Sequence, residues 1–333
     1  MVLAAQQPIQ DVRSRVVNSA LVNVDRGIHH LTFGAMSTKC RVLIHGVPEK
    51  QAREFQQQAL HWVADFEAKY SRFLPDSLVS RINQAAGEHW VDVDPEAERL
   101  FSLCDTAVFL TRGAFDPTAL PLIKLWNWKV PNPALPNHEA IESSRQLVGW
   151  TRVQRRPGAI FLPQPGMALD FGGIGKEFAV DRVAEMATQR GISHVLVDFG
   201  HDVRACGSAP GKDCWSVGLE DPTKPGTCWV GLAVRNMAVA TSGDYVRHSL
   251  INGRRYGHII DPRTGYPVDN GCRAVSVVAS SCTMAGLLST TAFILGPKDG
   301  LQLIETQPRS EGAVSTESHR GYTRRFYEHA ITS

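Results

Sequence analysis

Residues 169–177 read Leu169-Asp170-Phe171-Gly172-Gly173-Ile174-Gly175-Lys176-Glu177 and join a short apolar run to a glycine-rich turn. A helical pattern follows from 176 to about 191, and a strongly β-type run covers 194–198. A strand that enters a helix through a tight turn, with another strand after the helix, indicates helices packed on a sheet.

The same two patterns extend outward from this stretch. Apolar residues at helical spacing predict helices, and short apolar or β-branched runs between turn residues predict strands. The predicted helices cover 49–69, 78–84, 95–112, 120–126 and 283–295, and the predicted strands cover 40–44, 159–162, 168–171, 203–206, 215–219, 229–234, 238–241, 256–260 and 274–279. This order lacks regular βαβ alternation, so we expect an α/β or α+β fold with a mostly antiparallel or mixed sheet.

The length of 333 residues allows one large domain or two intimately joined α/β lobes. Residues 1–27 lack clear periodicity and are expected to be a lead-in, either strand-forming or a loose arm. Residues 28–333 are expected to form a single domain. The proline-rich segment 129–137 is the best candidate for a loop or hinge within it.

The composition is that of an ordinary globular protein, with 43% apolar and 20% charged residues. A formal net charge of +2 gives no concentrated basic field for nucleic acid or a membrane surface. No window approaches the ~20 apolar residues of a membrane span, and no signal peptide is evident. We expect a cytoplasmic protein, or a periplasmic one if a leader was removed. The seven cysteines form no CxxC pair, which predicts reduced, mostly buried thiols.

The glycine turn suggests a phosphate site. Backbone N–H groups at the start of a helix, together with the ammonium of Lys176, attract anions. The turn matches neither a Walker A loop nor a dinucleotide fingerprint. A tight strand–helix contact that requires glycine is the alternative explanation of the same residues.

Two later segments also carry polar groups at strand ends. Thr241-Ser242-Gly243 offers short hydroxyl donors and little bulk, although the same residues commonly make a simple turn. His258 precedes Ile259-Ile260-Asp261-Pro262. A histidine at a strand edge near a carboxylate can act as a general base, while a purely structural histidine is the alternative.

Together with Gly34-Ala35-Met36, Phe73-Leu74-Pro75-Asp76-Ser77 and Gly113-Ala114-Phe115-Asp116-Pro117, these segments resemble the ApbE family of FAD:protein FMN transferases. The resemblance runs in order from about residue 30 to 297. It implies an FAD groove between two lobes, with FAD as substrate, Mg²⁺ assistance, AMP release and transfer of FMN to a Thr or Ser hydroxyl. The acceptor would be a separate protein, because this chain contains no Asp-Gly-x-Thr/Ser-Gly-Ala-Thr sequence.

The resemblance also assigns residues. His258 matches the base that deprotonates the acceptor hydroxyl, and the Gly173 carbonyl and Thr290 match metal ligands. The matches to FAD contacts are Met36, Phe73, Ala114, Phe115, Asp116, Asp170, Lys176, Thr241, Ser242, Gly243, Ile260 and Asp261.

Three departures from the family pattern accompany these matches. The metal-binding Ala-Asp-x-x-Ser-Thr pattern places Gly286 where the aspartate belongs. Glu177 follows Lys176 in place of glycine, and His201 interrupts a Gly-Gly-Asp pattern. We therefore keep three hypotheses: a transferase with an adapted metal site, an FAD carrier, pyrophosphatase or assembly factor, and a non-catalytic interaction module. If Asp244 or Asp261 does not substitute, Gly286→Asp is expected to raise Mg²⁺-dependent turnover.

Overall fold

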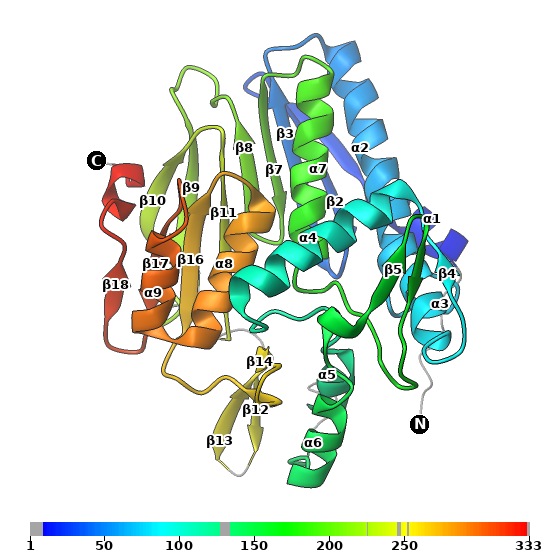
Figure 1. Cartoon of the computed structure of the whole chain (residues 1–333). Coiled ribbons are helices and arrows are strands. Elements are labelled where there is room, and N and C mark those ends of the chain that lie inside the picture. Colours follow the sequence, from blue (N-terminus) through cyan, green and yellow to red (C-terminus); the bar gives the residue numbers. More distant parts are fainter. Residues whose placement is uncertain (1–8, 127–133, 225, 245–247, 252, 332–333) are drawn as a thin grey trace.

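A nine-stranded sheet organises the computed structural model, which describes residues 9–126, 134–224, 226–244, 248–251 and 253–331 (Figure 1). Its neighbouring strands are all antiparallel. In order across the sheet they are β1 (Leu21–Asp25), β2 (Ile28–Ala35), β3 (Thr38–His45), β7 (His194–Phe199), β8 (Asp202–Cys206), β11 (Met237–Gly243), β16 (Ala274–Ala279), β17 (Glu311–Ser315) and β18 (Arg320–Tyr322). The helix–strand mixture is confirmed, and the large sheet is antiparallel rather than mixed.

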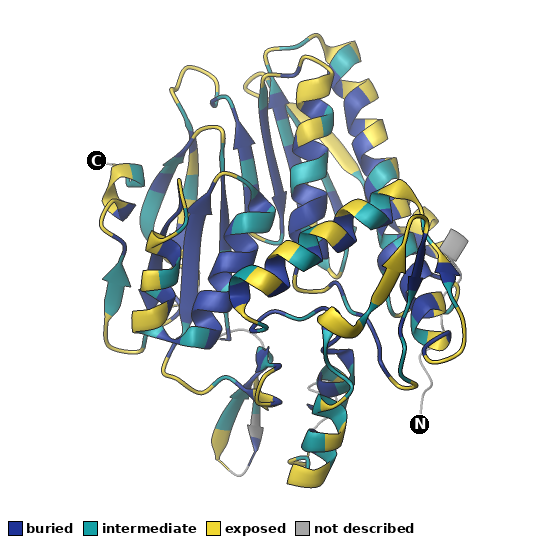
Figure 2. Cartoon of the chain, in the orientation of Figure 1, coloured by how far each residue is buried: buried dark blue, intermediate teal, exposed yellow. Residues whose placement is uncertain are grey.

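The sheet carries different layers on its two faces. Helices α2 (Glu49–Tyr70), α7 (Gly175–Gln189), α8 (Cys282–Leu295) and α9 (Pro297–Glu305) cover one face. The hairpin of β9 (Trp215–Glu220) and β10 (Cys228–Val234) covers the other. Strand β7 shows the alternation that this requires, because Val195 and Val197 join the helical core while Leu196 joins the hairpin core. In Figure 2 the buried sides of the helices face the sheet.

Smaller elements surround this framework. Near α2 lie α1 (Ile9–Asn18), α3 (Leu78–Gln84), α4 (Pro95–Thr111), η1 (Trp150–Arg152), β4 (Val91–Asp92), β5 (Gln154–Arg156) and β6 (Ala159–Phe161). At the lower end of Figure 1 lie α5 (Leu120–Trp126), α6 (His138–Arg145), β12 (His248–Ile251), β13 (Arg254–Gly257), β14 (Ile260–Asp261) and β15 (Tyr266–Pro267). The chain ends with η2 (Phe326–His329). None of the described helices is long and apolar enough to cross a membrane.

Local signals set the helix ends. Ser77 begins α3 by accepting a hydrogen bond from the Ser80 N–H, and Asp94 does the same for α4 with Ala97. Helix α4 ends at Arg112, which has a left-handed φ of 50° and is followed by Gly113. The predicted helices at 49–69, 78–84, 95–112, 120–126 and 283–295 are therefore confirmed to within two residues.

One predicted strand is wrong, and a second is divided in two. Residues 168–171 form only one isolated bridge, between Ala168 and Ala119. The side-chain amide of Asn83 bonds both backbone groups of Leu169, at 2.6 and 3.0 Å, so Leu169 needs no partner strand. The strand predicted at 256–260 is divided between β13 and β14, and His258 lies in the break.

Other segments differ from the sequence expectations or lie outside what the structure describes. Within the lead-in, residues 9–25 form α1 and then β1, which pairs with β2 in the large sheet. Most of the hinge candidate at 129–137 falls outside the described residues, and Asn137 caps the unpredicted helix α6. Helix α9 and strands β17 and β18 are also additions to the prediction.

Candidate active site

The start of α7 presents the ammonium of Lys176 to the central strand β8 of the sheet. Lys176 is ion-paired with the carboxylate of Asp202, which is buried at the start of β8, and its Nζ lies 3.4 Å from Oε1 of Glu177. Oδ1 of Asp202 also accepts a hydrogen bond from the backbone N–H of Thr241 at 3.4 Å. One cation is thus shared by two carboxylates beside the end of β11.

Hydroxyl groups extend this cluster across three elements. Oγ1 of Thr241 lies 2.8 Å from Oγ of Ser276 on β16. Oγ of Ser242 lies 2.8 Å from both Oγ of Ser289 and Oγ1 of Thr290 on α8. Because strand residues alternate between faces, Thr241 and Ser276 face the β9–β10 hairpin, whereas Ser242 faces the helices. Ser242 and Thr290 therefore share the helix side of the sheet with Lys176, and Thr241 contributes its backbone N–H at the same end of β11.

Glu177 and Gly286 are in direct contact between α7 and α8. A Cβ at position 286 would lie 2.5 Å from Cγ of Glu177, 3.2 Å from its Cδ and 3.4 Å from its Oε1. The Glu177 residue is only 8% exposed, and its buried Oε2 has no hydrogen-bond partner among the described residues. A buried carboxylate oxygen without a donor is unfavourable unless something else compensates its charge.

Asp181 fixes the start of α8 against α7. Its carboxylate accepts hydrogen bonds from the N–H of Cys282 at 2.7 Å, the N–H of Thr283 at 2.8 Å and the Thr283 hydroxyl at 2.7 Å. Burial raises the pKa of Asp181, and these three hydrogen bonds oppose the rise. Asp181 lies one turn after Glu177, so both side chains are on the face of α7 that meets α8.

The glycine turn before α7 is held from two sides. The Asp170 carboxylate accepts from the Gly172 N–H at 2.8 Å and pairs with Nε of Arg72 at 3.1 Å. The Arg72 guanidinium stacks 4.5 Å from the ring centre of Phe73, which is 54% exposed. These contacts connect the predicted residues Phe73 and Asp170 through Arg72.

Phe115 forms the other side of this turn. A Cβ at Gly173 would lie 3.2 Å from Cε2 of Phe115, so the ring packs closely on the glycine backbone and would have to shift slightly for a larger residue. The neighbouring Ala114 is buried. The Asp116 carboxylate accepts hydrogen bonds from the N–H and hydroxyl of Thr118 at 2.8 and 2.5 Å and from the N–H of Trp150 at 3.0 Å. The carboxylate of Asp116 therefore holds its own loop.

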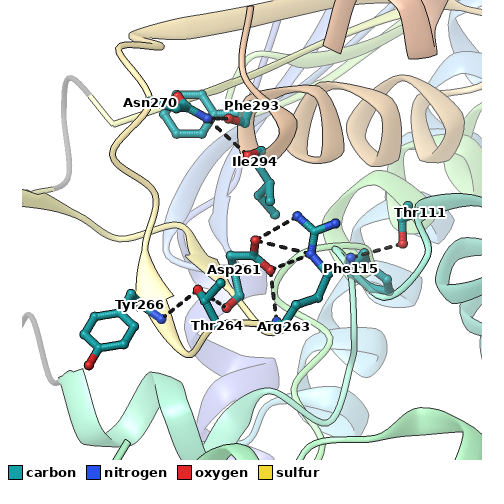
Figure 3. A network of polar contacts seen from close by, with 9 residues as sticks. All are labelled: Thr111, Phe115, Asp261, Arg263, Thr264, Tyr266, Asn270, Phe293 and Ile294. Atoms are coloured by element: carbon teal, nitrogen blue, oxygen red, sulfur yellow. Dashed lines mark hydrogen bonds and ion pairs between the residues drawn. The ribbon is translucent and has the colours of Figure 1, made fainter. Parts of the chain in front are cut away.

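Strand β14 and the turn after it supply Ile260 and Asp261. Ile260 is buried in a small cluster with Leu122, Trp126 and Ile141 from α5 and α6. The Asp261 carboxylate pairs with Arg263 through contacts of 2.8 to 3.2 Å (Figure 3). Ile260 thus packs toward α5 and α6, and the Asp261 carboxylate is held by the guanidinium of Arg263.

His258 occupies the short break before β14 and is half-buried. Gly257, just before it, packs closely on Asp244, because a Cβ there would lie 2.9 Å from Cβ of Asp244. Asp244 is buried and lies 3.1 Å from Arg255 and 3.5 Å from Arg273. The Asp244 carboxylate is thus already compensated by two guanidinium groups.

Met36 lies in the tight turn between β2 and β3. Met36 and Ser37 have φ values of 50° and 59°, as a two-residue hairpin turn of this hand requires. The Met36 N–H donates to Oε2 of Glu67 at 3.0 Å, and its side chain packs on the main core. The turn between β7 and β8 lies alongside, because the Gly200 N–H donates to the carbonyl of Lys39 at 3.0 Å.

The sequence did not single out every residue of this site. Arg72 precedes the Phe73 segment, and Asp202 follows His201. Glu177 is visible in the sequence only as a departure from the family pattern. The described residues contain no group of three or more His, Cys, Asp or Glu side chains suited to a metal ion. A Mg²⁺ ion does not need such a group, because it keeps several waters and takes one or two carboxylates together with substrate phosphates. The unpartnered Oε2 of Glu177 and the Thr290 hydroxyl fit that requirement.

Comparison with known proteins gives a consistent result. The sequence model of the ApbE family matches residues 36–314. The FAD:protein FMN transferase of Treponema pallidum (strain Nichols) is 30% identical over 296 residues, which cover 82% of this chain and 80% of the relative. That of Klebsiella pneumoniae (strain 342) is 32% identical over 228 residues, which cover 68% and 70%.

Among solved structures with the same fold, two superpose over most of this chain. The ApbE protein of Thermotoga maritima superposes with a TM-score of 0.83 at 29% identity, over 92% of this chain and all of that one. The flavin transferase ApbE of Vibrio cholerae gives 0.81 at 24% identity, over 93% of this chain and 99% of that one.

Proposed function

Because the chain belongs to the ApbE family, we propose that it transfers FMN from FAD to a Thr or Ser hydroxyl of an acceptor protein and releases AMP. The observation that carries this proposal is the convergence of Lys176, Thr241, Ser242 and Thr290 at one end of the sheet. Phosphoryl transfer needs cations and hydroxyl or N–H donors placed together around the phosphates, and this cluster offers both.

The proposed site divides the binding of FAD between two regions. The ammonium of Lys176 and the N–H groups at the start of α7 attract the pyrophosphate. The exposed ring of Phe73 offers aromatic surface for the flavin, while the buried ring of Phe115 supports the glycine turn from the core side. The side chain of Ile260 is buried against α5 and α6, so it supports this side of the site from within.

In the proposed reaction the acceptor oxygen attacks the phosphorus on the FMN side of FAD. The bond from this phosphorus to the bridging oxygen breaks, and that oxygen leaves with AMP. His258 takes the proton of the acceptor hydroxyl as the general base. A divalent cation, when bound, neutralises charge that develops on the phosphate oxygens.

Product analysis after incubation with FAD and Mg²⁺ tests this function. An acceptor peptide with the Asp-Gly-x-Thr-Gly-Ala-Thr pattern is added to one sample and omitted from another. AMP release that depends on the peptide supports the transferase. Release of FMN and AMP without peptide labelling would indicate a pyrophosphatase, and bound but unchanged FAD would indicate a carrier.

A further inference from the structure

We propose that Glu177 supplies, from α7, the metal-binding carboxylate that the family pattern places at position 286 of α8. Glu177 and Thr290 would then bind a divalent cation of the Mg²⁺ type between the two helices. This inference rests on the proposed function, and it explains two departures from the family pattern by a single exchange of side chains.

The side chain of Glu177 fills the space that an aspartate at 286 would use. The carboxyl carbon of such an aspartate would lie about 1.5 Å, one carbon–carbon bond, from its Cβ. The Glu177 carboxyl carbon lies 3.2 Å from that same Cβ position. The two carboxyl groups would therefore lie within a few ångströms of each other, and Gly286 leaves the room that the longer Glu177 side chain occupies.

The charges around Glu177 favour binding of a further cation. Lys176 pairs most closely with Asp202, and Glu177 contacts the same ammonium only at 3.4 Å. Two carboxylates thus share one ammonium, which leaves one negative charge among these three groups. The buried Oε2 of Glu177, without a hydrogen-bond partner among the described residues, marks where that charge is uncompensated.

The other nearby carboxylates are already paired. Asp244 lies between Arg255 and Arg273, and Asp261 is paired with Arg263. The buried Oδ1 of Asp244 also has no hydrogen-bond partner among the described residues, but two cations flank this carboxylate, whereas Glu177 shares a single ammonium with Asp202. Since guanidinium groups compensate both carboxylates, neither Asp244 nor Asp261 replaces the missing aspartate as well as Glu177 does.

Thr290 lies on the correct face of α8 to share a cation with Glu177. Positions 286 and 290 are one turn apart and project to the same side of the helix. Glu177 covers that face at 286, and Oγ1 of Thr290 lies 2.8 Å from the Ser242 hydroxyl. One carboxylate with neutral oxygens suits Mg²⁺, which completes its shell with waters and phosphates.

The test measures cation binding directly, with Mn²⁺ as a paramagnetic probe for the Mg²⁺ site. Free Mn²⁺ is followed by electron paramagnetic resonance during titration of the full chain, with and without FAD. The variants are Glu177→Gln, which keeps the packing, and the exchange Glu177→Gly with Gly286→Asp. Glu185→Gln on the exposed side of α7 is the matched control, since it removes a carboxylate from the same helix. Thermal unfolding confirms that each variant is folded.

We expect Glu177→Gln to weaken Mn²⁺ binding by at least about tenfold, the exchange to restore most of it, and Glu185→Gln to leave it unchanged. Mn²⁺ binding by Glu177→Gln as tight as that of the parent chain would overturn the proposal, and so would failure of the parent to bind Mn²⁺ in either condition. Cation binding that depends on Glu177 in a chain that transfers no FMN would instead reject the proposed function and retain the metal site.

Discussion

Glu177 on α7 lies directly over Gly286 on α8, with its Cγ 2.5 Å from where a Cβ at 286 would stand. The two positions are far apart in the chain, yet each departs from the family pattern and each explains the other. A glycine inside a helix costs about 1 kcal/mol relative to alanine. The contact accounts for its presence, because any larger residue at 286 must displace a buried glutamate.

Gly286→Asp alone is therefore expected to destabilise the protein. The new Cβ would collide with Glu177, and overpacking of this kind costs about 1–3 kcal/mol. Urea unfolding measures the loss, and Glu177→Gly in the same chain should recover most of it. A single variant as stable as the parent would show that Glu177 moves aside freely. If Glu177 supplies the metal-binding carboxylate, Gly286→Asp by itself is not expected to raise turnover, in contrast to the expectation from the sequence alone.

Lys176→Ala, alone and combined with Asp202→Ala, should distinguish the role of Lys176 in stability from its role in FAD binding. It leaves Asp202, which is buried, without its ion-pair partner, and a broken buried pair costs about 3–5 kcal/mol at most. Adding Asp202→Ala should recover stability without recovering FAD affinity, measured by quenching of flavin fluorescence. If the double variant binds FAD like the parent, Lys176 does not contact the pyrophosphate.

Asp181→Ala is expected to loosen the start of α8. The substitution removes the acceptor for two backbone N–H groups, and loss of a cap of this kind costs up to about 2 kcal/mol. The free energy of unfolding in urea and the affinity for Mn²⁺ should both decrease, because Gly286 and Thr290 follow on the same helix. Unchanged unfolding would mean that other contacts hold α8. Asp181→Asn, which keeps one acceptor oxygen, should lose less.

Stability should also depend on His329 near neutral pH. Burial lowers the pKa of His329 below its usual value, so the unfolded chain binds a proton more readily than the folded one. The free energy of unfolding should therefore fall as the pH drops through about 6.5 toward the lowered value. Unfolding titrations between about pH 7.5 and 5.5 measure this slope, and His329→Gln should reduce it. An equal slope in the variant would assign the effect to other groups.

Much of the fold follows from local patterns in the sequence. The spacing of buried residues in α2 and the caps Ser77 and Asp94 identify helices without tertiary information. Helix α6 escapes prediction because only Ile141 among its residues is buried, so no apolar stripe exists to detect. Residues 168–171 have an apolar, strand-like pattern but do not form a strand. The Asn83 side chain bonds the backbone of Leu169 in place of a neighbouring strand.

In the site, too, some features are visible in the local sequence and others depend on tertiary contacts. Lys176 and Thr241 lie in short motifs whose chemistry is visible in the sequence. The contact of Glu177 with Gly286 depends on the antiparallel approach of α7 and α8, which Asp181 fixes through the N–H groups of Cys282 and Thr283. No local pattern carries that information. The roles of the predicted FAD contacts and of His258 stay predictions, to be tested by the reaction itself.

The most direct measurement is the mass of an acceptor peptide after incubation with the full chain, FAD and Mg²⁺. We expect the peptide to gain the mass of one FMN at its Thr or Ser, with AMP in equal amount. His258→Ala should abolish the gain while FAD still binds. A peptide that keeps its original mass, while the parent chain binds FAD and Mn²⁺, would contradict the account.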